Sequence, residues 1–161
     1  PSLSPGSRNL SERTPMTMTF GQAVKHVFSN YATFRGRAAR SEFWWFYLFS
    51  VIVSLVLELI SRPLGLTIGN TDYVIGEGAN ATVITVAGVS ILSTIWSLAI
   101  LLPTLAVGTR RFHDSNRSAW NWLWLLAIPL CGLGAIILLI WWILPGTPGP
   151  NRYGEGPAQP A

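Results

Sequence analysis

Two clusters of charged side chains are the residues of this sequence best suited to chemistry. One lies within FRGRAARSEFWWF at residues 34–46, and the other within RRFHDSNRSAW at residues 110–120. Both are rich in arginine, whose guanidinium fork donates paired hydrogen bonds to phosphate or carboxylate oxygens. The candidate binding residues are Arg35, Arg37, Arg40, Arg110, Arg111, His113, Asp114 and Arg117. The pattern predicts a surface for anionic lipid headgroups or for an acidic partner.

The same clusters also fit a structural role. Basic residues next to apolar stretches anchor membrane helices on one side of the bilayer. If a helix continues through the second cluster, Arg110, His113 or Asp114, and Arg117 share one face, and Asp114 can pair with either arginine. The two clusters would then lie at the same depth and form one polar patch. We interpret them first as anchors and second as a binding surface.

The sequence offers little for catalysis or metal binding. His113 and Asp114 are adjacent, but a catalytic or metal site needs further converging groups, and the other histidine is His26. The sequence contains no CxxC, HExxH, glycine-rich phosphate loop or nucleophile elbow. A single cysteine, Cys131, cannot form an intrachain disulfide. We therefore predict no enzymatic activity, no catalytic or metal-binding residue and no cofactor.

The elements that must position the clusters are membrane helices. Hydrophobic residues make up 50% of the 161 residues and charged residues 11%, whereas a soluble domain carries about 25% charged residues. Residues 78–109 and 118–151 contain no charged residue, and about 20 predominantly apolar residues cross a bilayer. The composition excludes an ordinary soluble enzyme and predicts an all-α integral membrane protein.

We predict about three transmembrane helices preceded by an amphipathic helix. The amphipathic helix is expected at residues 19–36, beginning with a capping box between Thr19 and Gln22. It can lie in the membrane interface or pack on the other helices. The expected spans, which together with it form a membrane domain over residues 19–145, are residues 43–60, 83–107 and 120–144.

The third span and the connecting segments are less regular. Pro129, Gly132 and Gly134 interrupt residues 120–144, which we interpret as one kinked span, because a hairpin would leave two helices too short to cross. The remaining segments share polar, proline-rich or glycine-rich sequences. We expect a disordered segment at residues 1–18, an external loop at residues 61–81 and an extended tail at residues 146–161.

The charge distribution predicts the orientation. Nine of the eleven lysines and arginines fall on one side of the three expected spans, which places the N-terminus in the cytoplasm and the tail outside. A hairpin in place of the third span would return the tail to the cytoplasm. The net charge of +4 is thus a topology signal, and no nucleic-acid partner is predicted.

A small oligomeric transport subunit is the alternative function. Glu58 lies within the first expected span, although Arg62 four residues later is well placed for an ion pair. Hydroxyl side chains also follow one face of the second expected span, at Ser90, Ser93, Thr94 and Ser97. We interpret this stripe as hydrogen bonding between helices rather than as a pore lining.

Three separated motifs resemble the YhaH-like family of bacterial inner-membrane proteins, catalogued as domain of unknown function 805. They are YATFRGRAARSEFWW from Tyr31, RRFHDSNRSAW from Arg110 and GTPGPNRYG from Gly146, with Pro103, Pro129 and Gly132 between them. The resemblance covers about residues 20–157. Phe112 stands where the family usually has leucine, residues 115–116 depart from its frequent threonine-glycine, and the 61–81 connection is longer than in compact members.

The resemblance implies a small polytopic protein of the bacterial inner membrane and brings no activity with it. Membrane lipids with anionic headgroups are the expected partners. A second copy of the chain or another membrane protein is a further candidate.

Overall fold

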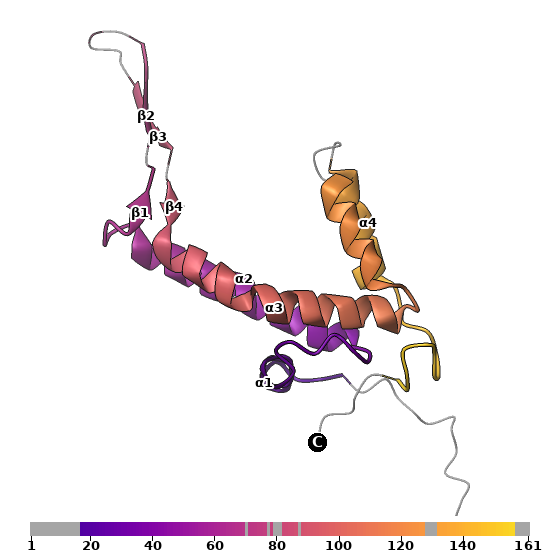
Figure 1. Ribbon diagram of the computed structural model, residues 1–161. Coiled ribbons are helices and arrows are strands. Elements are labelled where there is room, and N and C mark those ends of the chain that lie inside the picture. The colour runs from indigo at the N-terminus through magenta and orange to yellow at the C-terminus, as the bar shows by residue number, and fades with distance from the viewer. Residues whose placement is uncertain are drawn as a thin grey trace, which may run out of the picture.

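The computed structural model describes residues 17–69, 71–76, 78, 82–86, 88–127 and 132–156. Two long helices, α2 (Arg40–Ser61) and α3 (Ile91–Asp114), lie side by side and run in opposite directions. A β-ladder projects from one end of the pair, and the shorter helices and the tail gather at the other end (Figure 1). Residues 1–16, which fall in the segment expected to be disordered, lie outside the described residues.

The residues of the first expected span form helix α2. It covers 22 residues, or about 33 Å at about 1.5 Å per residue, and starts three residues before the expected boundary. Its apolar side chains are largely exposed on the isolated chain, with Leu55 at 64% and Leu59 at 74%. Both α2 and α3 are long and apolar enough to cross a membrane. This exposure fits helices whose outer faces meet lipid rather than water.

The second expected span is displaced along the chain, because its first residues are strand. β3 (Thr82–Val86) pairs antiparallel with β2 (Thr71–Ile75), and β4 (Val89–Ser90) pairs with β1 (Thr67–Ile68). The run Thr-Val-Ile-Thr-Val is β-branched throughout, which favours strand although it is as apolar as a membrane helix. The fold is therefore mostly helical rather than all-α, and the expected loop at 61–81 contains strands.

Helix α3 begins after this ladder and ends later than expected. The Ser90 side chain caps it by accepting from the Ser93 amide at 3.2 Å. Pro103 lies inside the helix, which nevertheless continues seven residues past the expected end to Asp114. The extension carries most of the second charged cluster on one continuous helix.

The third expected span is wrong as a single kinked helix. A 3-10 helix, η3 (Ala119–Ala127), and a short α-helix, α4 (Leu133–Ile143), pack against each other instead. Gly132 adopts a left-handed φ of 72°, and a Cβ on Gly134 would lie 1.9 Å from the carbonyl oxygen of Trp124. Gly134 allows this close contact, so η3 and α4 pack as a hairpin. The tail consequently returns to the end of the molecule where α2 begins (Figure 1).

The helix expected at residues 19–36 is shorter. α1 (Phe20–Ser29) begins with the predicted capping interaction, in which the Gln22 side chain accepts from the Thr19 amide at 3.0 Å. It ends where the Asn30 side chain donates to the carbonyl oxygen of His26 at 2.9 Å. Residues 30–39 are irregular, with Gly36 at a φ of 86°. This turn brings the first charged cluster back to the helix ends.

The buried core lies at the same end of the molecule. It consists of apolar side chains from α1, α2, α3 and the turn, with three aromatic residues packed against it. The buried members are Val27, Ala38, Phe43, Phe46 and Val107, and the aromatic ones are Trp44, Phe49 and Trp142. The charged clusters are thus built around the best-packed part of the described chain.

Candidate functional site

Asp114 holds two arginines in a buried ion triad. Its Oδ1 lies 2.9 Å from Nη2 of Arg37, and its Oδ2 lies 2.5 Å from Nη1 of Arg111. Arg37 comes from the turn after α1, whereas Arg111 lies one helical turn before Asp114 on α3. All three side chains are at most 6% exposed. The triad therefore ties the turn to the end of α3 out of contact with water.

Glu42 forms a second buried network. Its Oε1 lies 2.8 Å from Nη1 of Arg110 and 3.0 Å from Nδ1 of His26. The carboxylate comes from the first turn of α2, so the network joins α1, α2 and α3. Arg110 is 4% exposed and Glu42 is fully buried. An unpaired charge at such a depth would be costly, and each partner stabilises the other.

The two charged clusters do converge, but with different pairs from those expected. Asp114 pairs with neither Arg110 nor Arg117. Residues four apart on a helix are neighbours, yet Arg110 turns toward Glu42, and Arg117 lies beyond the end of α3. The guanidinium of Arg117 instead covers the ring of Trp141 at 4.5 Å.

The arginines of the ion triad also bind the tail, and we call these contacts the latch. Arg37 donates to the carbonyl oxygens of Thr147 and Gly149, each at 2.5 Å. Arg111 donates to the carbonyl oxygens of Trp142, at 3.2 Å, and Leu144. These carbonyls have no helical partner of their own, and the arginines supply the missing donors. The tail expected outside the membrane thus lies at the same end as α1.

Three further tail contacts complete this latch. The amide of Thr147 donates to the carbonyl oxygen of Asp114 at 2.8 Å. The Asn151 side chain donates to the carbonyl oxygen of His113 at 2.9 Å. The ring of His113 stacks on Tyr153 with 3.8 Å between ring centroids, and its Nδ1 lies 3.2 Å from the Gly36 carbonyl oxygen. His113 is thus engaged in tail packing.

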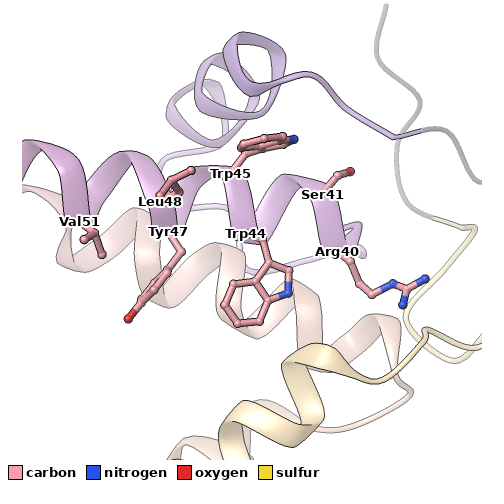
Figure 2. Close-up of a pocket in the computed structure, with 7 residues that line it drawn as sticks. All are labelled: Arg40, Ser41, Trp44, Trp45, Tyr47, Leu48 and Val51. Carbon is pink, nitrogen blue, oxygen red and sulfur yellow. The ribbon is translucent and has the colours of Figure 1, made fainter.

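Two predicted residues, Arg35 and Arg40, remain exposed. Arg40 stands at the start of α2 and lines a groove of about 460 Å³. The other lining residues are Ser41, Trp44, Trp45, Tyr47, Leu48 and Val51. In Figure 2 the guanidinium of Arg40 extends away from the aromatic side chains, and Trp44 and Trp45 project to opposite sides of α2. The groove is thus apolar along its length and cationic at one end.

Arg35 lines a different cavity, of about 340 Å³, between α1, the turn, α3 and the tail. Its walls include His26, Arg37, Arg110 and residues 153–156 of the tail. The arginines predicted as one patch are therefore divided among four settings, namely buried ion pairs, the face of the Trp141 ring, an apolar groove and a polar cavity.

The polar residues considered for transport make hydrogen bonds within and between elements, including one of 3.4 Å from Ser93 on α3 to Glu58 on α2. Nε of Arg62 donates to Glu58 at 3.1 Å, as the spacing predicted. Thr94 and Ser97 donate to carbonyl oxygens one turn earlier on α3, and Ser90 donates to Ser61 at 2.7 Å. Within the described part of the chain, no group of three or more histidine, cysteine, aspartate or glutamate side chains is placed to hold a metal ion.

Sequence reasoning missed the partners of the arginines. Glu42 and His26 were not predicted to pair with each other. The backbone carbonyl groups of Thr147 and Gly149 could not be predicted as partners, because a backbone group leaves no pattern in a sequence. The sequence feature that points to the tail is the GTPGPNRYG motif. It lies near the helix ends because the η3–α4 hairpin turns the chain back toward them.

Comparison with known proteins gives a consistent result. The family described as "Protein of unknown function (DUF805)" matches residues 31–155. The chain is 40% identical to "Inner membrane protein YhaH" of Escherichia coli (strain K12) over 131 residues, which covers 81% of this chain and 92% of the relative. It is 36% identical over 131 residues to "Inner membrane protein YhaI" of the same strain, covering 81% and 91%. No solved structure matches significantly.

Proposed function

Because the chain belongs to the DUF805 family, whose relatives include inner membrane proteins of Escherichia coli, we propose that it binds an anionic phospholipid at the surface of the inner membrane. The observation that carries this proposal is the groove along α2, which is apolar for most of its length and ends at Arg40. A phospholipid has the matching form, with an apolar chain and an anionic phosphate.

Different parts of the groove suit the acyl chain and the headgroup of such a lipid. Trp44, Tyr47 and Val51 line the part that would face an acyl chain. The indole of Trp45 donates to the carbonyl oxygen of Met18 at 3.0 Å, which fixes one wall. Aromatic side chains of this kind prefer the membrane–water interface, where their rings contact chains and their polar atoms contact headgroups.

Arg40 differs from the other arginines near it because its guanidinium is available. Among the described residues it has no hydrogen-bond or ion-pair partner, whereas Arg37 and Arg111 are committed to Asp114 and the tail. A guanidinium fork binds phosphate oxygens in paired hydrogen bonds. One basic residue near an anionic surface contributes about 1 kcal/mol, or about fivefold in a binding constant.

The charge distribution supports a cytoplasmic location for this end of the molecule. Among the described lysines and arginines, only Arg62 lies at the opposite end, beside the β-ladder. The positive-inside rule favours the cytoplasm for the basic end, and with it α1 and the tail. The β-ladder would then project from the outer face.

Native mass spectrometry of the purified full-length chain tests the proposal. We expect wild type to retain phosphatidylglycerol in preference to phosphatidylcholine, and Arg40→Gln to lower that retention about fivefold. Arg62→Gln is the matched control, because it removes an equal charge from the other end and should leave retention unchanged. Equal loss in both variants, or none in Arg40→Gln, would contradict lipid binding at the groove.

A second variant tests the apolar part of the groove independently of Arg40. Val51→Trp adds a large side chain at the end opposite Arg40 without altering any ionisable group. We expect it to reduce retention of both lipids, because the acyl chain would lose its place. Unchanged retention of both would show that the groove does not hold the chain.

A further inference from the structure

We propose that the cavity between α1, the turn and the tail is a separate binding site for a phosphoryl group. This cavity, of about 340 Å³, is walled by side chains from four parts of the chain. They include His26 on α1, Arg35 and Arg37 on the turn, Arg110 on α3 and Tyr153 on the tail. Its volume lies within the range of about 300–1,000 Å³ usual for small-molecule sites.

Arg110 is the main indication of a ligand. Its Nη1 is bound to Glu42 at 2.8 Å, but its buried Nε and Nη2 have no hydrogen-bond partner among the described residues. A buried charged donor without an acceptor is destabilising, typically by more than a neutral group would be. Oxygens of an anion in the cavity that Arg110 lines would supply the acceptors.

Arg35 provides a second available guanidinium. It is exposed, lines the same cavity and has no hydrogen-bond or ion-pair partner within the described ranges. Arg37 contributes positive charge, although its own donors are bound to Asp114 and to the tail. The guanidinium groups of Arg35 and Arg110 reach this cavity from different elements. Such an arrangement suits a tetrahedral anion, which offers acceptor oxygens in several directions.

The surrounding charges favour an anion over a cation. The guanidinium groups at or beside the cavity belong to Arg35, Arg37, Arg110 and Arg111, and the carboxylates to Glu42, Asp114 and Glu155. Asp114 is paired with two arginines and Glu42 with Arg110 through its Oε1, whereas Oε2 of Glu42 and the carboxylate of Glu155 have no partner among the described residues.

The tail wall of the cavity is held in place. Asn151 and Gly154 exchange two backbone hydrogen bonds of 3.0 Å, with Gly154 at a φ of 120° that other residues rarely adopt. Tyr153 between them stacks on His113. A site whose walls are already ordered loses little conformational entropy when a ligand enters.

The test is calorimetric titration of the full-length chain, in a neutral detergent, with inorganic phosphate. We expect saturable binding by wild type and about tenfold weaker binding by Arg35→Gln, which removes one charged fork from an exposed position and should leave the fold intact. Arg40→Gln is the control, because that residue lines the α2 groove and not this cavity. Its phosphate affinity should equal that of wild type.

The phosphoryl group could belong to a free phosphate or to a lipid headgroup, and a second measurement distinguishes these sources. If inorganic phosphate does not bind but retention of phosphatidylglycerol in native mass spectra falls about tenfold in Arg35→Gln, the ligand is a headgroup. The inference is overturned if Arg35→Gln equals wild type in both measurements, or if wild type binds neither probe. Because the α2 groove is tested by Arg40→Gln, the two proposals can fail separately.

Discussion

Replacing Asp114 by asparagine removes one negative charge from between Arg37 and Arg111 and nearly preserves the side-chain shape. In the wild-type chain the carboxylate oxygens lie 2.9 and 2.5 Å from the two guanidinium groups, and the three side chains are at most 6% exposed. The variant places an amide NH₂ against one of those donors. Both arginines would keep their charge in a buried setting without a counter-ion.

The expected cost follows from that burial. Breaking a buried ion pair by removal of one partner typically destabilises a protein by about 3–5 kcal/mol. For a chain of this length, about 1 kcal/mol corresponds to roughly 2–4 °C, so the melting temperature should fall by roughly 6–20 °C. The loss should be accompanied by release of the tail, because Arg37 holds the carbonyl oxygens of Thr147 and Gly149.

The assay is thermal unfolding in detergent, followed by circular dichroism, with limited proteolysis of the tail as a second readout. Glu58→Gln is the matched control, since it neutralises a carboxylate in the exposed pair with Arg62, where about 0–1 kcal/mol is expected. If the two variants lowered the melting temperature equally and left the tail equally protected, the ion triad would not be the latch.

Further predictions concern three glycines and the two termini. Gly146→Ala should lower the melting temperature, because the added Cβ would lie 2.0 Å from Oδ2 of Asp114; overpacking of this kind costs about 1–3 kcal/mol. Gly134→Ala should also destabilise, since its Cβ would lie 1.9 Å from the Trp124 carbonyl oxygen, whereas Gly21→Ala meets nothing within 4 Å on α1 and should stabilise by about 0.4–1 kcal/mol in the same melts. Reporters fused to the two termini should show both on one side of the membrane, and opposite sides would contradict the η3–α4 hairpin.

The sequence predicted the long helices better than their boundaries. Helix α2 was evident from its continuous apolar run, which is much longer than a typical strand. The start of α3 was misplaced because residues 82–86 are apolar enough for a membrane helix, and only their β-branched character indicates the ladder. Hydropathy measures transfer from water and does not distinguish an apolar strand from an apolar helix.

The third segment was misread for a different reason. Residues 120–144 were expected to cross the bilayer because of their length and apolar character, and this expectation favoured one kinked helix. Contacts that form only in three dimensions decide otherwise, above all the approach of Gly134 to the backbone of η3. The left-handed conformation of Gly132 fits either a kinked helix or a hairpin. The glycine in the sequence therefore does not distinguish the two.

For the candidate site, the convergence of the two charged clusters could be predicted, but the pairing could not. Convergence follows from charges that flank adjacent helices. The pairs depend on the turn that carries Arg37 and on the first turn of α2 that carries Glu42, and no periodic pattern places either against α3. The role of the tail was hidden because it acts through backbone carbonyl groups.

The latch also imposes an order on biosynthesis. Arg37 bonds to carbonyl groups 110 and 112 residues later in the chain, so a ribosome makes the donor long before its acceptors. Helices α2 and α3 are both synthesised before those acceptors. Only when residues 147–149 emerge can the Arg37 guanidinium bind the tail. Closure of the latch is therefore a late step in folding, which cannot precede synthesis of these residues.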